Sequence, residues 1–383
     1  MKISSSRCFV LSLIALAGLG ISALAEQSSS SQSAPTPKTQ AREVQLPVTV
    51  VDKHGALVTN LTAKDFTLTE DGRPQVIKSL TTQSTLPFQL GLLVDTNHSV
   101  YSAMDSERKA AEKFVELMLP ADPKAAARGD EAFLIHFDRE VELLEDFTNS
   151  REKLDREIDQ MTPTSQERKS QGPETSGDDR GYGHPGGGRF SGTQVYDAIY
   201  LASDELMKPK EGRKALVVFS DGVDRDSRET LNDAIDAADH ANVQVFTVYF
   251  KGQEERPLNE YPGGRHGGMG GGYPGGYPGG GGGWPGSGGG GGRHGNEAQV
   301  DGRKIMQEIA QRTGGQYFEA KKKDDLEEKY NLIAGALHQQ YLLTYTPDKV
   351  DTEGGFHKIV LKANNGDLTV FTSEGYYALG SDK

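Results

Sequence analysis

The fold is decided by the stretch Gln89-Leu-Gly-Leu-Leu-Val-Asp-Thr-Asn-His-Ser99. From Gln89 to Val94 it is a nearly continuous apolar run, which is typical of a strand buried on both faces of a sheet. The polar residues that follow mark the end of that strand. Two later runs, Ala215–Phe219 and Val243–Tyr249, have the same character. Strands of this kind predict a sheet that is covered by helices on both faces.

Helical periodicity fills the intervals between these strands. Apolar residues recur at three- or four-residue spacing, which places them on one face of a helix. The predicted helices lie within residues 104–118, 154–161, 195–206, 231–238, 305–310 and 326–337, and further strands are predicted at 132–137, 141–144 and 316–319. This alternation predicts an α/β fold with a doubly wound, mostly parallel, Rossmann-like sheet.

Both flanks of the α/β region have β character. Strands are predicted at 44–51, 66–70, 76–80, 341–346, 356–362 and 368–372, with turn signals at Asp71-Gly72 and Asn365-Gly366. Two or three strands are marginally stable alone, so the N-terminal flank needs a partner sheet. We therefore predict a small discontinuous β domain built from an N-terminal segment, 44–82, and a C-terminal segment, 341–378. The α/β domain, residues 88–340, would be inserted between them.

The N-terminus has the pattern of a secretory signal peptide over residues 1–25. A short basic start precedes the apolar run Cys8–Ile21, and Ala23-Leu24-Ala25 fits the cleavage pattern. The run is shorter than the roughly 18–20 residues that span a bilayer, although an uncleaved anchor is the alternative. Residues 26–43 are predicted to be a flexible linker. We expect a secreted, periplasmic or cell-envelope protein with no transmembrane segment after cleavage.

Composition excludes several classes of function. Removing Lys2 and Arg7 with the signal leaves 40 basic and 55 acidic side chains, a net charge of −15 with His neutral, which argues against nucleic-acid binding. The only cysteine is Cys8, so the mature chain has no disulfide, no catalytic thiol and no thiolate zinc site. Many of the 47 glycines fall in two insertions, 162–190 and 257–297, which we predict to be disordered.

Polar side chains converge on one predicted edge of the sheet. Asp95 and Ser99 follow the first buried strand, Thr193 precedes a helix, and Asp221 follows the strand Ala215–Phe219. Ligands of doubly wound sheets bind at the carboxyl ends of the strands. Two carboxylates and two hydroxyls suit a hard cation, Mg²⁺ or Mn²⁺, and leave a position open for an outside oxygen. A carboxylate from a partner protein would complete such a site.

At this point the chain resembles the von Willebrand factor type A, or integrin I-like, domain. That family has a metal-ion-dependent adhesion site with the pattern Asp-x-Ser-x-Ser, then a distant Thr and a distant Asp. Asp95, Ser99, Thr193 and Asp221 match it in order, and the resemblance covers about residues 88–345. It implies a metal-binding, protein-interaction module in which the partner offers an Asp or Glu.

The flanks are similar to those of a secreted bacterial group of von Willebrand factor type A-related proteins best known from acidobacteria. The segments that carry this similarity are Asn60–Gly72, Tyr341–Tyr345 and Glu374–Tyr376. The motif itself departs from the family at one place, where Asn97 stands for the first Ser. Its amide oxygen is a candidate fifth ligand, or it leaves that place to water, so metal occupancy depends on Asn97.

The rim of this site, including His98 and Asp224, is predicted to contact the partner. Simpler structural roles compete with these predictions. Asp95 and Ser99 are also residue types that cap helices, Asp221-Gly222 is a turn sequence, and Asp224 with Asp226 fits a solvated acidic loop.

No nucleophile elbow, zinc-protease motif or phosphate-binding loop is present, so we predict that the protein is not an enzyme. Asp95-Thr-Asn97 loosely resembles the start of aspartate phosphotransferases, which have Asp where Asn97 stands. The leading hypothesis is a metal-dependent adhesion module. A metal-independent envelope assembly scaffold is the alternative, and a metal-assisted hydrolase using the same carboxylates is the third.

Overall fold

The computed structural model describes residues 43–82, 86–97, 99–119, 128–162, 193–251, 301–349 and 354–378. All of these described residues belong to one compact unit. The predicted signal peptide lies outside the described residues, as do nearly all of the predicted linker and both glycine-rich insertions. Within the described ranges, no helix combines the length and the apolar character needed to cross a membrane.

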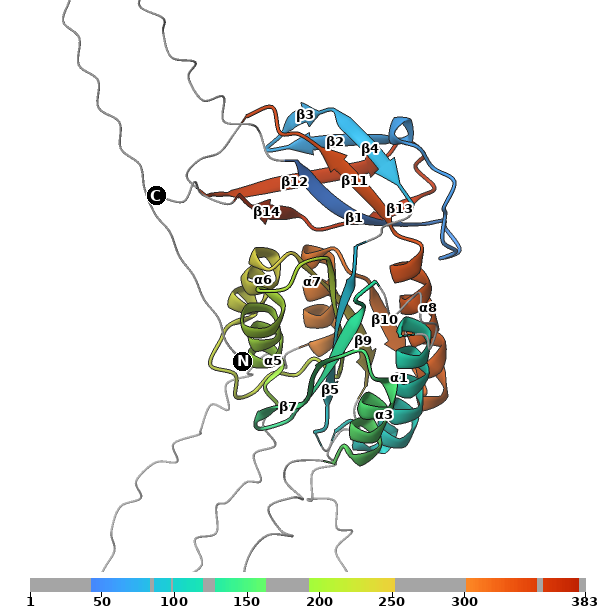
Figure 1. The fold of residues 1–383 in the computed structure, drawn as a ribbon, viewed down its shortest axis with the longest axis vertical. Helices are drawn as coiled ribbons and strands as arrows, with labels where there is room; N and C mark the ends of the chain where they lie inside the picture. Colours follow the sequence, from blue (N-terminus) through green and yellow to red (C-terminus); the bar gives the residue numbers. More distant parts are fainter. Residues whose placement is uncertain are drawn as a thin grey trace, which may run out of the picture. The chain divides into compact units, whose positions relative to one another are not determined.

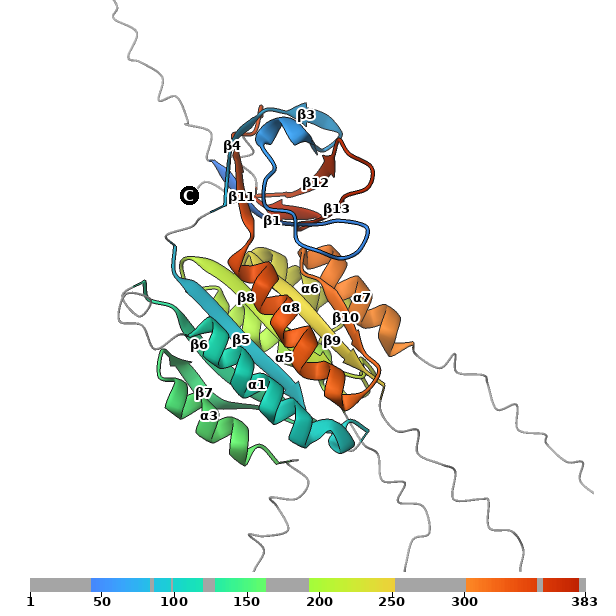
Figure 2. The ribbon, with the colours of Figure 1, turned by 90° about the vertical axis from the view of Figure 1, so that its right-hand side faces the viewer.

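The centre of the molecule is a six-stranded sheet in the order β10-β9-β8-β5-β6-β7 (Figures 1 and 2). Its strands are β5 (Phe88–Asp95), β6 (Glu131–Phe137), β7 (Val141–Thr148), β8 (Arg213–Ser220), β9 (Val243–Phe250) and β10 (Tyr317–Ala320). All neighbours are parallel except β7, which runs antiparallel to β6 at the edge. The predicted fold class, a mostly parallel α/β sheet, is confirmed.

Burial explains why the central runs form strands. Every residue of β5 and of β9 is buried, because helices cover both faces of the sheet. Packing across the sheet is tight at Gly91, where a Cβ atom would lie only 2.3 Å from Phe133 Cζ and 2.5 Å from Leu216 Cδ2. Gly91 therefore leaves room for side chains of the two neighbouring strands, β6 and β8.

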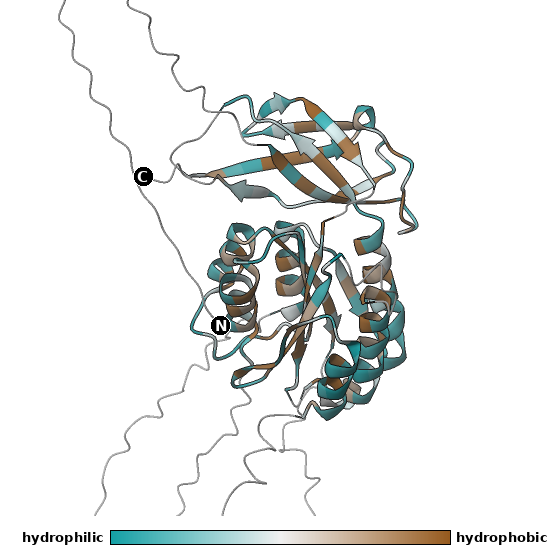
Figure 3. Cartoon of the chain, viewed as in Figure 1, coloured by the Kyte–Doolittle hydropathy of each residue, from teal (hydrophilic) through white to brown (hydrophobic). Residues whose placement is uncertain are grey.

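Two layers of helices enclose the sheet. The helices are α1 (Met104–Met118), α3 (Arg151–Gln160), α5 (Val195–Leu201), α6 (Leu231–His240), α7 (Gly302–Thr313) and α8 (Leu326–His338), with short helical turns η1 (Ala63–Asp65), η2 (Tyr101–Ala103), η3 (Ala202–Met207) and η4 (Lys323–Asp325). Helices α1, α3 and α8 form one apolar core with one face of the sheet, and α5, α6 and α7 form the other. Figure 3 shows hydrophilic and hydrophobic residues interspersed along the helices of both layers, as expected for helices that bury one face.

The two flanks build a β sandwich. One sheet has the order β13-β1-β11-β4 and the other β14-β12-β2-β3. The strands are β1 (Val44–Val51), β2 (Phe66–Glu70), β3 (Arg73–Gln75), β4 (Ile77–Thr81), β11 (Tyr341–Tyr345), β12 (Phe356–Ala363), β13 (Thr369–Phe371) and β14 (Gly375–Tyr377). Each sheet combines two N-terminal with two C-terminal strands, which alternate in the first sheet, and the strands of both sheets share one apolar core. The predicted β domain made from both flanks is confirmed, whereas its exact boundaries stay a proposal.

Several details of the sandwich differ from the prediction. Asn365-Gly366 does not close a hairpin, because β12 pairs with β2 and β14 while β13 pairs with β1 in the other sheet. Strands β3 and β14 were not predicted, since three residues are too few to show an alternating pattern. The predicted turn at Asp71-Gly72 is present, with Asp71 in the left-handed region at φ 48°, but it joins β2 to β3. The strand predicted at 76–80 is β4, which pairs with β11 in the other sheet and not with β2.

Candidate metal site

The predicted site lies at the carboxyl edge of the central sheet. Strands β5 and β8 are parallel neighbours paired through Val94 and Phe219, so the residues after them emerge side by side. This places Ser220 next to Asp95, and the Ser220 hydroxyl donates a hydrogen bond of 2.7 Å to Asp95 Oδ2. Strand pairing therefore determines which two loops meet at this edge.

The predicted ligands are joined by short polar contacts. Ser99 Oγ donates to Asp221 Oδ2 at 2.7 Å. The backbone N–H of Asn97 donates to Asp95 Oδ1 at 2.9 Å, and the Asn97 side-chain amide donates to Thr193 Oγ1. Residues from three loops, separated by up to 125 positions in the chain, thus meet in one place. We interpret this group as the predicted cation site.

The electrostatics of the group favour a cation. Asp95 has no exposed surface, and burial, reinforced by the charge of Asp221, raises its pKa to about 8 despite the hydrogen bonds from Ser220 and Asn97. Within the described residues, neither Asp95 nor Asp221 forms an ion pair with Lys, Arg or His. Buried charge normally requires a partner or a metal, so the donor set fits a divalent cation.

The simpler structural roles are partly present in the same contacts. One oxygen of Asp95 accepts from the Asn97 N–H, and one oxygen of Asp221 accepts from Val223 N at 3.0 Å. These bonds hold the two loops in tight turns. In each case the second oxygen faces a hydroxyl of the cluster. The turn role and the ligand role are therefore compatible, because they use different oxygens.

Asn97 is oriented as a donor. Its amide nitrogen, not its oxygen, points to Thr193 Oγ1, and an N–H group cannot bind a cation. The ligand role of the Asn97 oxygen stays a prediction. Thr193 itself is fully buried, and its carbonyl accepts from Arg225 N at 3.1 Å, which fixes its loop against the loop after β8.

The two predicted rim residues have different outcomes. His98 lies outside the described residues. Asp224 is half-buried and accepts from Ser227 Oγ at 2.6 Å and from Tyr196 N at 3.2 Å. Burial raises its pKa. Asp224 thus ties the acidic loop to the start of α5, and its contact with a partner stays a proposal.

Sequence reasoning missed two buried polar residues beside the site. Ser220 is fully buried and holds Asp95 as described, and Asp138 is nearly buried at 4% exposure. The backbone carbonyl of Asp138 accepts from Gln194 N at 2.9 Å, and its charge adds to the raised pKa of Asp95. Ser220 could have been found as the residue that ends the strand before Asp221, but only once β8 was known to lie beside β5.

Comparison with known proteins identifies a domain family for one part of the chain. The family model of the von Willebrand factor type A domain matches residues 189–266. The chain contains a von Willebrand factor type A domain. Within the described residues, the match covers 193–251 and includes α5, β8, α6 and β9. No curated protein sequence matches the chain. The resemblance to an acidobacterial group stays a prediction.

Several solved structures are similar to part of this chain. An aerotolerance-related membrane protein from Bacteroides fragilis is 15% identical, with 65% of this chain and 98% of that chain covered and a TM-score of 0.37. The vWF domain of the type V pili tip protein Mfa5 from Porphyromonas gingivalis is 13% identical, with 67% and 96% covered and a TM-score of 0.41. Proximal thread matrix protein 1 from the mussel byssus, solved with a zinc-occupied MIDAS motif, is 10% identical, with 66% and 48% covered and a TM-score of 0.39.

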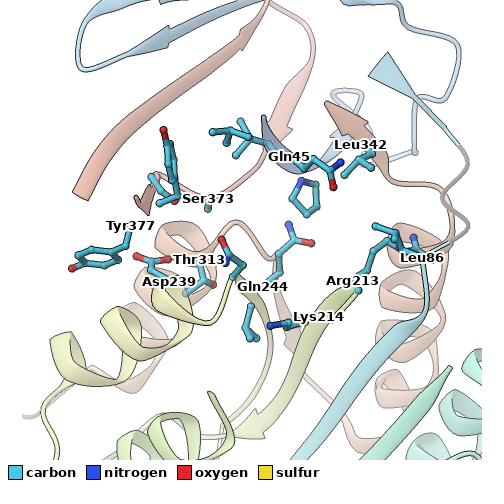
Figure 4. A pocket seen from close by; sticks show the side chains of 18 of the residues that line it. Gln45, Leu86, Arg213, Lys214, Asp239, Gln244, Thr313, Leu342, Ser373 and Tyr377 are labelled. Atoms are coloured by element: carbon cyan, nitrogen blue, oxygen red, sulfur yellow. Dashed lines mark hydrogen bonds between the residues drawn. The ribbon is translucent and has the colours of Figure 1, made fainter. Parts of the chain in front are cut away.

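A cavity of 440 Å³ lies at the opposite edge of the von Willebrand factor type A domain, where the strands begin and the sandwich covers them (Figure 4). Its basic side chains already have partners, because Lys214 Nζ donates to Ala241 O at 3.0 Å and Arg213 donates to Leu337 O at 3.3 Å. Asp239 also lines it, and burial raises the pKa of Asp239 to about 7. None of the residues that line the cavity belongs to the cation site.

Proposed function

We propose that this chain is a secreted or cell-envelope protein-binding module whose von Willebrand factor type A domain uses a divalent cation, Mg²⁺ or Mn²⁺. Asp95, Ser99, Thr193 and Asp221 would hold the cation, and an Asp or Glu of the partner would complete its coordination. The observation that carries the proposal is the pair of carboxylates, Asp95 and Asp221, at the end of a buried strand pair, where neither forms an ion pair with another described residue.

The cation would supply positive charge and an open coordination position for the partner's oxygen. The chain's own residues prepare that position. Ser220 and the Asn97 N–H each hold one Asp95 oxygen, and Val223 N holds one Asp221 oxygen. Because these donors fix both carboxylates in the folded protein, little ordering is left to be done when a cation and a partner bind.

The first experiment measures Mg²⁺ and Mn²⁺ binding to the full chain by titration calorimetry. Asp95→Ala removes a buried carboxylate and should abolish binding. Asp226→Asn is the matched control, because Asp226 is an exposed carboxylate on the loop that follows Asp221. Equal cation binding by wild type and Asp95→Ala would contradict the proposal.

The second experiment asks whether the cation mediates protein binding. The chain is immobilised and used to capture proteins from an envelope extract, with and without EDTA. We expect a partner that is lost in EDTA, is restored by Mg²⁺, and is not captured by Asp95→Ala. Capture of the same partner in EDTA would favour the scaffold hypothesis, and turnover of a phosphoester or peptide would favour a hydrolase.

A further inference from the structure

A second group of potential metal ligands lies in the β sandwich. Glu70 ends β2, Asp71 begins the following turn, and His357 lies on β12, the strand that pairs with β2. His357 Nδ1 is 2.9 Å from Asp71 Oδ2 and 3.4 Å from Glu70 Oε1. Among the described residues, this is the one group in which three His, Asp or Glu ligand atoms all lie within 4.8 Å of one another.

Outer contacts orient both carboxylates toward the imidazole. Tyr345 Oη donates to Glu70 Oε2 at 2.9 Å, and the Lys358 N–H donates to Asp71 Oδ1 at 3.0 Å. Each carboxylate therefore has one oxygen held by the scaffold and its other oxygen near His357 Nδ1, and Glu70 Oε1 also accepts a long hydrogen bond of 3.4 Å from Tyr376 Oη. Metal ligands in proteins are commonly oriented by such outer hydrogen bonds.

The spacing and the exposure suit a metal ion. Ligands about 2.0–2.1 Å from a tetrahedral metal are about 3.3 Å from one another, close to the 2.9 and 3.4 Å found here. The Glu70 side chain is 1% exposed, that of His357 15% and that of Asp71 35%. The group is thus closed on the Glu70 side and reachable by solvent on the Asp71 side.

We propose that Glu70, Asp71 and His357 form a binding site for a zinc-class divalent cation, with a fourth position open to water. One imidazole and two carboxylates are ligands for Zn²⁺ and similar first-row metals. The two carboxylates balance its charge. Arg73 is 3.8 Å from Asp71 Oδ2, and it also pairs with Asp348 at 3.4 Å.

This site would connect the two ends of the sandwich. Asp71 belongs to the N-terminal flank and His357 to the C-terminal flank, 286 residues later. A metal that binds only the folded protein stabilises it by mass action. Bound zinc would therefore stabilise the contact between β2 and β12, and it would act independently of the cation site at Asp95.

The alternative to a metal ion at this site is a proton on His357. A protonated His357 between two carboxylates would explain the same short distances as an ion pair, and the hydrogen bond from His357 already lowers the pKa of Asp71. The two possibilities separate experimentally, because an ion pair responds to pH and not to zinc.

The test uses the full chain, ZnCl₂ and thermal unfolding, with EDTA as the reference. At a zinc concentration about 100-fold above Kd, the unfolding midpoint of wild type should rise by about 5–10 °C. His357→Gln and Asp71→Asn should lose this rise and bind zinc about 100-fold more weakly or worse. Asp95→Ala should retain the rise, which separates this site from the one proposed for Mg²⁺.

The matched control is His54→Gln, because His54 is an exposed histidine in the N-terminal flank, outside the proposed site. It should respond to zinc as wild type does, and zinc bound by histidines elsewhere in the chain would be common to all variants. Asp71 is partly exposed, so Asp71→Asn keeps the test valid if His357→Gln fails to fold. A zinc-induced rise that is equal in wild type and Asp71→Asn, or absent from wild type, would overturn the proposal.

Discussion

The two acidic centres of this molecule differ in what balances their charge. At the carboxyl edge of the central sheet, Asp95 is fully buried beside Asp221, hydroxyls and amides are its donors, and its pKa is raised to about 8. In the sandwich, Glu70 is equally buried but is surrounded by His357 and two tyrosines. Burial alone therefore does not decide how a carboxylate is balanced: among the described residues the first centre has no ion-pair partner, whereas the second has the His357 imidazole within 3.4 Å.

The largest effect is expected where the charge is least balanced. Asp95→Asn keeps the shape of the side chain but removes the buried charge, so the stabilisation by Mg²⁺ should disappear. In EDTA at pH 8 the same variant should unfold at the same temperature as wild type or higher, because it no longer carries a buried carboxylate. Thermal unfolding with Mg²⁺ and with EDTA measures both. A variant that still responds to Mg²⁺ would remove Asp95 from the site.

A third buried carboxyl extends the comparison. Glu107 on α1 is fully buried, accepts a hydrogen bond from Tyr330 Oη, and has a pKa raised by burial to about 8. The folded state therefore keeps a proton that the unfolded state loses near pH 4.5. Stability should fall by a few kcal/mol as pH rises from about 4.5 to 8 and then level off.

Glu107→Gln tests this sign directly. The amide cannot ionise and still offers an acceptor oxygen to Tyr330, so the variant should lose this part of the pH dependence and be more stable than wild type above pH 8. Denaturant unfolding in EDTA at pH 5, 7 and 9 measures the difference. Parallel pH curves for the two proteins would show that Glu107 is not protonated in the folded state.

A smaller effect is expected in the sandwich, where the charge has partners. Tyr345→Phe removes the hydroxyl that donates to Glu70 Oε2 and leaves the other contacts of the buried carboxylate in place. We expect a loss of about 1–3 kcal/mol in the free energy of unfolding and zinc binding weaker by about 10–100-fold. Urea unfolding and zinc titration measure the two. Tyr376→Phe is a milder control, because its hydroxyl is 3.4 Å from Glu70 Oε1.

The smallest effect concerns the exposed cation next to the second centre. Arg73 is about one-third exposed and lies 3.8 Å from Asp71. An ion pair of this kind contributes about 0–1 kcal/mol, so Arg73→Gln should change stability little and should leave zinc binding within about threefold of wild type. A large loss of zinc affinity in this variant would mean that Arg73, and not a metal, balances Glu70 and Asp71.

Much of the fold could be predicted because its signals are local in the chain. The apolar runs of β5, β8 and β9 and the spacing of apolar residues in α1 and α8 need no knowledge of their neighbours. Short elements such as β14, with three residues, carry too little pattern. The sequence also did not predict that the chain passes from one sheet to the other between β12 and β13, because a turn sequence does not specify which strand the next residues will join.

The sequence by itself determined the type of sheet and the order in which Asp95, Ser99, Thr193 and Asp221 follow one another. Both can be recognised from short segments, because a buried strand shows as an apolar run and its end as the polar residues that follow. Tertiary structure alone decided that Ser220 would hold Asp95, that Asn97 would present its nitrogen to Thr193, and that His357 would meet Glu70 and Asp71. Those contacts depend on which strands pair and in what register. Pairing between residues as far apart as Asp71 and His357, which are 286 positions apart in the chain, is fixed by packing of the whole core.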